Sequence, residues 1–283
     1  MIRWYADNSE LRGIWGAEIP DILLFGGIIL DETATAEICA MMSDVKSGLH
    51  GNPTLPFKWN FRDLEKHYHE LGFGSVFTTL LESSRTWRSE IFSRLSAIDF
   101  KIIVSMILSY GTKRETLIRT RDQVTRFVFL MALQRVGLCV SSQSASSAEI
   151  VLDWPAEGKR SLFDLEYRCA HQNGSSAEFE QGYTCGPLKN IGFGESALFT
   201  STDECSVLQV CDLIVGATRE LVEEALGRKE NSLGVALLTQ IRDKFEGAPD
   251  NVVGRGVAIS PRHGGLYERV RKKIANLYGQ NTD

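Results

Sequence analysis

This chain lacks long hydrophobic runs, and its longest, from Ile22 to Leu30, is far too short to cross a bilayer. Its first residues contain no extended apolar segment of the kind that marks a secretory signal peptide. We therefore expect a cytoplasmic protein without a membrane partner. The six cysteines are scattered and include no CxxC pair, which favours reduced thiols over a disulfide framework or a zinc site.

Several signatures of catalysis are also missing. The sequence contains no phosphate-binding loop, no dinucleotide fingerprint and no recognisable Ser/His/Asp triad. Among the five histidines, His67 and His69 lie two positions apart on a predicted helix, so they face different directions and do not suggest a metal pair. The net charge of −5 argues against a protein that coats nucleic acid, although it leaves room for a local basic groove.

The composition that is present fits a folded domain. With 283 residues and 43% hydrophobic residues, the chain can form one large α/β domain or a core domain with an insertion. Apolar, β-branched segments predict strands at 2–6, 23–30, 100–108, 149–153, 188–191, 197–200 and 252–259. Periodicity and capping residues predict helices at 31–47, 62–71, 76–95, 112–137, 162–172, 205–226, 233–245 and 267–278.

This alternation predicts a mixed β-sheet flanked by helices. The short connection after the first strand favours an antiparallel hairpin, and the long helical connections that follow favour parallel crossovers. We expect a core at 1–226 with a helical insertion at about 31–98, and a C-terminal helix–strand–helix extension at 227–283 that packs on this core.

Three aspartates stand in apolar segments. Asp7 ends the first predicted strand, Asp153 ends a later one, and Asp212 lies within the predicted helix 205–226. A buried carboxylate is costly unless it is paired or binds a metal, and adjacent carboxylates repel one another. Mg²⁺ or Mn²⁺ would remove that repulsion, because hard cations prefer oxygen ligands. The alternative is three unrelated acids at the ends of elements, where aspartate often caps a helix.

The order of these pieces resembles a known family. Tyr5-Ala6-Asp7-Asn8-Ser9 comes first, and the glycine-containing strand at 25–29 and Phe57-Lys58-Trp59 follow. Val151-Leu152-Asp153 and Leu208-Gln209-Val210-Cys211-Asp212-Leu213 complete the set. Together they resemble domain of unknown function 3800, a prokaryotic family thought to belong to the ribonuclease-H-like superfamily. The resemblance spans about residues 1–226.

The resemblance implies a fold, an activity and a set of site residues. It implies a ribonuclease-H-like mixed sheet and a nuclease that hydrolyses phosphodiesters with two divalent metals, in the context of a mobile element or an anti-phage system. Asp7, Asp153 and Asp212 would be the catalytic acids and metal ligands. Lys58 would sit near a phosphate, and Gln209 would orient a water, the substrate or a neighbouring acid.

The chain departs from the family pattern at its first motif. The family has Asp-Glu-Ser-Gly, whereas this chain has Asp7-Asn8-Ser9-Glu10. Asn8 and Ser9 would still support the site, since an asparagine carbonyl can coordinate a metal, more weakly and without charge. The loss of the acid keeps a second hypothesis open, a catalytically degenerate domain that binds nucleic acid or a partner. A third hypothesis is a hydrolase acting on nucleotides or small phosphates.

Other residues are candidates for contacts with DNA or RNA. Arg119 and Arg126 lie on a polar helix face that would contact phosphates, or would simply be solvated. Trp59 could stack on a base or anchor its loop to the core. Asp203 precedes the helix that holds Asp212, and we favour a capping role for it over metal binding. The sequence leaves a protein partner or a homo-oligomer open.

Overall fold

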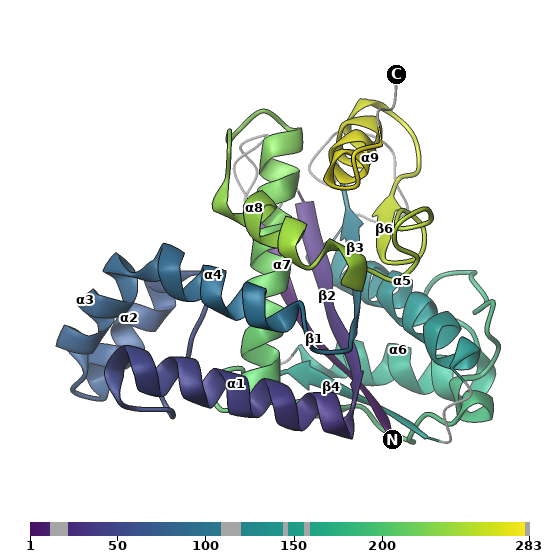
Figure 1. The fold of residues 1–283 in the computed structure, drawn as a ribbon. Helices are drawn as coiled ribbons and strands as arrows, with labels where there is room; N and C mark the ends of the chain where they lie inside the picture. The colour runs from purple at the N-terminus through teal and green to yellow at the C-terminus, as the bar shows by residue number, and fades with distance from the viewer. Residues whose placement is uncertain (12–21, 109–119, 144–146, 156–158, 281–283) are drawn as a thin grey trace.

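The computed structural model describes residues 1–11, 22–108, 120–143, 147–155 and 159–280. Within them the chain forms a mixed six-stranded sheet in the order β5-β4-β1-β2-β3-β6, with helices on both faces (Figure 1). The strands are β1 (Ile2–Leu11), β2 (Ile22–Asp31), β3 (Lys101–Ile107), β4 (Ala148–Asp153), β5 (Leu198–Thr200) and β6 (Val257–Ser260). The expectation of a mixed sheet flanked by helices is confirmed.

The α-helices follow the predicted pattern closely. They are α1 (Glu32–His50), α2 (Phe61–Glu70), α3 (Gly74–Glu82), α4 (Ser84–Leu95), α5 (Arg121–Ser142), α6 (Arg160–Asn173), α7 (Ser206–Ala225), α8 (Leu233–Gln240) and α9 (Gly265–Leu277). The predicted start of α1 is confirmed, because the Asp31 side chain caps it by accepting a hydrogen bond from the backbone N–H of Ala34.

Strand directions agree with those predicted from the sequence in all but one case. β1 and β2 pair antiparallel, whereas β4 runs parallel to β1, β5 to β4 and β6 to β3. β3 was expected to follow a parallel crossover, but it pairs antiparallel with β2, with Ile29 opposite Lys101. The excursion through α1–α4 returns the chain to the end of the sheet that it left, so β3 must run in the opposite direction.

Some predicted elements differ in kind or length. The segment 188–191, predicted as a strand, is a 3₁₀-helix, and the single helix predicted at 76–95 is two helices, α3 and α4. β1 does not end at Asp7 but continues to Leu11, because β2 pairs with it along its whole length. The first part of the helix predicted at 112–137 lies outside the described residues, and the described helix begins at Arg121.

Two hydrophobic cores enclose the sheet. On one face α7 packs across β1 and β2, with α1, α4, α8 and α9 around it. On the other face α5 and α6 cover the sheet (Figure 1). Side chains alternate between these faces, so Trp4 and Ala6 point to α5 and α6, and Tyr5 points to α7.

Among the described residues, α5 alone is long and apolar enough to span a membrane. Two thirds of its most apolar stretch is buried against the sheet and its neighbouring helices. This is the environment of a helix in a hydrophobic core.

Candidate functional site

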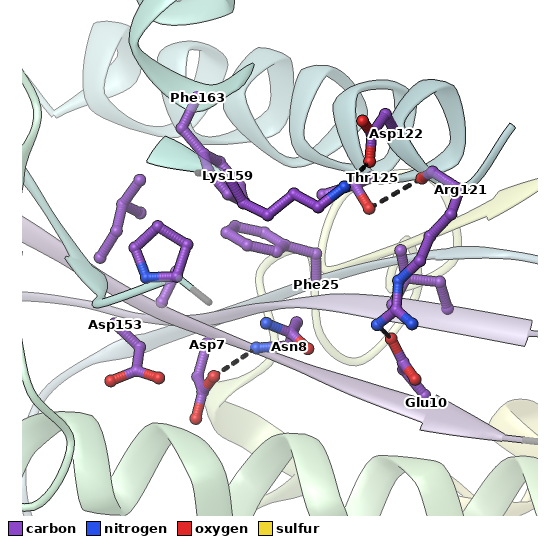
Figure 2. Close-up of a pocket in the computed structure, with 14 residues that line it drawn as sticks. Asp7, Asn8, Glu10, Phe25, Arg121, Asp122, Thr125, Asp153, Lys159 and Phe163 are labelled. Carbon is purple, nitrogen blue, oxygen red and sulfur yellow. Dashed lines mark hydrogen bonds and ion pairs between the residues drawn. The ribbon is translucent and has the colours of Figure 1, made fainter. Parts of the chain in front are cut away.

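Asp7 and Asp153 are neighbours on adjacent strands. Ala6 and Leu152 form the last residue pair between the parallel strands β1 and β4, and Asp7 and Asp153 are the next residue on each strand. Alternation turns both away from α5 and α6 and toward α7, as Figure 2 shows. Asp7 is only 8% exposed, because α7 covers this part of β1.

Helix α7 brings the third aspartate to the same place. The buried Cys211 thiol donates to the carbonyl oxygen of Tyr5 at 3.2 Å, which seats the helix on β1 two residues before Asp7. Asp212 is the next residue of α7 and is half-buried. The three aspartates that the sequence singled out therefore converge from β1, β4 and α7; we call them the acid cluster.

The acid cluster is electrostatically strained. Burial raises the pKa of Asp7 well above its usual range, and repulsion from Asp212 and then Asp153 raises it further. Burial also raises the pKa of Asp212, although the backbone N–H of Trp59 and the charge of Lys58 oppose that rise. Because the charges of Asp212 and Asp153 make the buried Asp7 harder to ionise, the site favours an additional positive charge.

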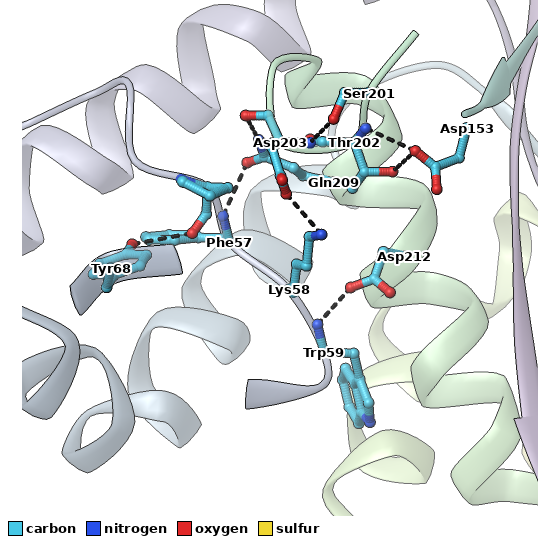
Figure 3. Close-up of polar contacts among 11 residues, drawn as sticks. Phe57, Lys58, Trp59, Tyr68, Asp153, Ser201, Thr202, Asp203, Gln209 and Asp212 are labelled. Carbon is cyan, nitrogen blue, oxygen red and sulfur yellow. Dashed lines mark hydrogen bonds and ion pairs between the residues drawn. The ribbon is translucent and has the colours of Figure 1, made fainter. Parts of the chain in front are cut away.

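The segment before α2 supplies one such charge. Its backbone is fixed to α7 by two hydrogen bonds, from the N–H of Phe57 to Gln209 Oε1 at 3.1 Å and from the N–H of Trp59 to Asp212 Oδ2 at 2.5 Å. Phe57 and Trp59 bury their rings, and Lys58 between them points to the acids (Figure 3). Anchors on both sides therefore hold the ammonium in place.

Lys58 forms a short ion pair with Asp203, with 2.7 Å between Nζ and Oδ1. Burial alone would lower the pKa of Lys58, but the contact with Asp203 and the nearby charges of Asp212 and Asp153 outweigh it and raise the pKa. Asp203 was expected to cap α7, but the N-cap of α7 is Cys205 and Asp203 instead pairs with this lysine. That role requires a residue distant in sequence, so local pattern alone did not reveal it.

A turn before α7 fixes Asp153. Oδ1 of Asp153 accepts hydrogen bonds from the backbone N–H of Thr202 at 2.8 Å and from its hydroxyl at 2.6 Å. Gln209, only 1% exposed, donates to the carbonyl oxygens of Thr202 and Asp203. Because the Phe57 N–H donates to its side-chain oxygen, Gln209 connects the loop before α2 to the turn before α7 and holds both beside the acids. Thr202 is a supporting residue that the sequence gave no reason to select.

The donor chemistry of the acid cluster fits a hard divalent cation. Asp153 and Asp212 each use one oxygen for the hydrogen bonds above, and within the described parts of the chain no hydrogen bond occupies their second oxygens. The carboxylate of Asp7, whose pKa is raised by burial and then by its two acidic neighbours, would be stabilised in its ionised form by Mg²⁺ or Mn²⁺. In the described residues, however, no three His, Cys, Asp or Glu side chains are close enough to form a ready-made metal cage.

The remaining predicted residues lie apart from the acid cluster. Asn8 is exposed and points to the opposite face of the sheet from Asp7, where it lines the pocket described below. The Ser9 hydroxyl accepts a hydrogen bond from Arg219 at 3.4 Å. Arg126 is ion-paired with Glu178 at 3.2 Å and its side chain is only 13% exposed, so it is not a free phosphate contact. Arg119 lies outside the described residues.

Trp59 anchors its loop and does not present its ring to solvent. It is 6% exposed, and the Arg88 guanidinium lies 4.3 Å from the ring centroid. Arg88 also donates to the carbonyl oxygen of Trp59 at 2.6 Å. Of the two roles considered for Trp59, its burial supports anchoring; stacking on a base would require the ring to leave the core.

A pocket of about 290 Å³ opens beside the acid cluster, on the face of α5 and α6 (Figure 2). Its apolar wall includes Phe25 and Phe163, whose ring centroids are 5.6 Å apart. Two ion pairs, Arg121–Glu10 and Lys159–Asp122, stand at its charged side. The full lining is Ala6, Asp7, Asn8, Glu10, Leu23, Phe25, Arg121, Asp122, Thr125, Leu152, Asp153, Pro155, Lys159 and Phe163.

Comparisons of the chain with protein-family models, with curated proteins and with solved structures returned no match.

Proposed function

We propose that this protein is a divalent-metal-dependent nuclease that hydrolyses phosphodiester bonds at the acid cluster. The observation that carries the proposal is Asp7, a buried carboxylate with a raised pKa, held against Asp153 and Asp212 from two other elements. Such an arrangement is unfavourable for folding by itself. Its cost is understandable if Mg²⁺ or Mn²⁺ neutralises the carboxylates in the working protein.

Each residue has a role in this proposal. Asp7, Asp153 and Asp212 would hold two ions, which activate water and stabilise the leaving oxygen when bound. Hydrolysis adds the water oxygen to phosphorus, breaks one P–O bond and leaves a proton on the departing oxygen. The side chain of Lys58, raised in pKa and therefore charged, would bind a non-bridging phosphate oxygen.

The arrangement supports the ribonuclease-H-like assignment. A mixed sheet carries two of the acids on adjacent strands, and a helix packed across it carries the third, as the resemblance implies. Gln209 and Lys58 of the resembling motifs also lie beside the acids, although they come from opposite sides of the site. We propose the fold family on this shared placement.

One observation favours a domain that binds without cleaving. Asn8 stands where the family has an acid, and its side chain lies across the sheet from Asp7. The 290 Å³ pocket favours the other alternative, a hydrolase of nucleotides or small phosphates, because a small ligand suits a pocket of this size.

The test is calorimetric titration of Mn²⁺ into wild type and into the Asp7→Ala/Asp153→Ala double variant. A matched control is Asp44→Ala/Asp250→Ala, which removes two exposed acids from outside the site. Each protein is then incubated with labelled single- and double-stranded DNA and RNA, and separately with free nucleotides. We expect Mn²⁺ binding and polymer cleavage by wild type and the control, and loss of both in the Asp7/Asp153 variant.

The other outcomes separate the hypotheses. Activity on free nucleotides and none on polymers would replace the nuclease by the small-phosphate hydrolase. Polymer binding without Mn²⁺ binding or cleavage would identify the degenerate binding domain.

A further inference from the structure

A solvent-exposed tryptophan follows one of the acids directly. Trp154 is the residue after Asp153 and is 56% exposed. By contrast Trp4, Trp59 and Trp87 are each at most 6% exposed. A large ring that stays more than half exposed gains little hydrophobic stabilisation from folding, and tryptophan is enriched where a protein meets a ligand or partner.

Trp154 belongs to a small assembly that we call the aromatic platform, made of Trp154, Phe199 and Arg160. The rings of Trp154 and Phe199 meet edge to face with centroids 6.1 Å apart. The Arg160 guanidinium lies 4.7 Å from the Phe199 centroid and 5.8 Å from that of Trp154. Asp164, one turn along α6, holds the arginine with an ion pair of 3.1 Å.

The aromatic platform is fixed relative to the acid cluster. The backbone N–H of Trp154 donates to the carbonyl oxygen of Thr200 at 2.9 Å. Two residues further along the same segment, Thr202 binds the carboxylate of Asp153. The segment that continues from β5 therefore contacts both Trp154 and Asp153, whose side chains leave the sheet on opposite faces, Trp154 toward α6 and Asp153 toward α7.

We propose that the aromatic platform stacks on an unpaired base of a single-stranded nucleic acid that crosses the end of β4 to reach the acid cluster. This inference rests on the proposed function and specifies its substrate. An aromatic ring beside an arginine suits a base, because the base stacks on the ring and the cation adds to that attraction. Bases inside a duplex have both faces covered by their neighbours, so the platform selects unpaired strands.

A second copy of this chain is the competing occupant, since Leu198 on the edge strand β5 is 47% exposed nearby. The net charge of −5 repels a nucleic acid as well as a second copy, so overall charge does not separate the two occupants. The Arg160 guanidinium against the two rings favours the nucleic acid, because it adds a local cation where a base would stack.

The experiment uses the full chain carrying Asp7→Asn, which is expected to prevent cleavage and removes one charge that repels phosphate. In this background Trp154→Ala, Trp154→Phe and Arg160→Gln are compared with Leu71→Ala, a control at an exposed apolar residue after α2. Binding of labelled oligothymidine, oligouridine and a hairpin duplex is measured in EDTA by anisotropy, together with quenching of tryptophan fluorescence.

We expect single strands to bind and to quench fluorescence in the parent and in Leu71→Ala. Trp154→Ala should weaken binding about 5- to 100-fold and remove the quenching that Trp154 causes. Trp154→Phe should retain part of the affinity, and the duplex should bind weakly throughout.

Equal affinity in Trp154→Ala and its parent, equal binding of the duplex, or no binding by the parent would overturn the platform. So would self-association that Trp154→Ala abolishes, because it would identify a contact between copies. If wild type never cleaves but binds single strands in a way that depends on Trp154, the nuclease is rejected and the platform is kept. If Trp154→Ala changes neither cleavage nor binding, the platform is rejected and the nuclease is kept.

Discussion

At the residue scale, the charge of Asp7 is the feature on which the site depends. Its folded-state pKa is raised well above the ordinary value, chiefly by burial and then by Asp212 and Asp153. Between the pKa of the unfolded chain, about 3.9, and the higher folded value, the native protein holds a proton that the unfolded chain has released. Ionising Asp7 therefore costs stability, and that cost grows as the pH rises through this window.

The Asp7→Asn variant is accordingly expected to be more stable than wild type at pH 7 without metal. It removes the buried charge and keeps the shape of the side chain, so we expect Tm to rise by roughly 2–6 °C. Thermal unfolding in EDTA across pH 4–8 measures this, and the difference should shrink toward pH 4. A variant less stable than wild type at pH 7 would contradict the electrostatic account.

Adding Mn²⁺ should reverse the order, because a ligand that binds only the native state stabilises it. The Tm of wild type should then rise with Mn²⁺ concentration, and that of Asp7→Asn should change little.

Reasoning from the sequence, with the family resemblance, reached the acids, Lys58 and Gln209, but not the role of every residue around them. Asp7, Asp153 and Asp212 stood out because each interrupts an apolar segment, and they do converge. Thr202 gave no such signal and Asp203 was assigned the wrong role, that of a cap, since their contacts are hydrogen bonds and an ion pair to residues far along the chain. The sequence also did not reveal that Trp154 is exposed, because the exposure of this side chain depends on which strand ends beside it.

At the element scale, the fit between α7 and the loop before α2 decides where Lys58 lies. Gly216 is one turn after Asp212 on α7, and Trp59 lies against it so closely that a Cβ there would be only 2.2 Å from Cγ of the Trp59 ring. The absence of a side chain at 216 is therefore what admits Trp59. With Trp59 seated, its backbone N–H reaches Asp212 and Lys58 is directed to the acids.

Gly216→Ala is expected to destabilise the protein by about 1–3 kcal/mol, because overpacking Trp59 outweighs the gain in helix propensity. The matched control is Gly48→Ala in α1, where an added Cβ would have nothing within 4 Å. This control should stabilise by about 0.5–1 kcal/mol through propensity alone. Urea unfolding of both variants measures the difference, and an effect of the same sign in both would refute the packing argument.

Element boundaries also show where local pattern fails. The first strand reads as a short segment ending at Ala6, because polar residues follow it. It extends to Leu11 because β2 pairs with it throughout, so cross-strand hydrogen bonds override local composition. The same extension places Asp7 inside the strand, where its side chain is fixed by the pleat.

At the scale of the whole molecule, residues 227–283 complete the sheet and one of its cores. β6 pairs with β3, and α8 and α9 pack on α7. The extension contributes to the core beneath α7 a large group of buried side chains: Leu237, Leu238, Ile241, Phe245, Val252, Val257, Ile259, Val270, Ile274 and Leu277. Without it, β3 would become an exposed edge and α7 would lose one side of its packing.

A chain that ends at residue 226 is therefore expected not to fold cooperatively. It should aggregate, or bind a hydrophobic dye and lose its near-UV circular dichroism. A chain that ends at residue 280 is the control and should behave as wild type. Size-exclusion chromatography and circular dichroism compare them, and a monomeric, cooperatively unfolding 1–226 fragment would show that the extension is dispensable.

The sequence by itself determined the class of fold, most element positions and the three aspartates, because periodicity and an acid in an apolar segment are local signals. The tertiary structure alone decided the direction of β3, the face on which Asn8 lies, the pairing of Lys58 with Asp203 and the exposure of Trp154. These properties depend on which distant segments meet. Contact between residues far apart in the chain is fixed by packing of the whole molecule, which no local pattern encodes.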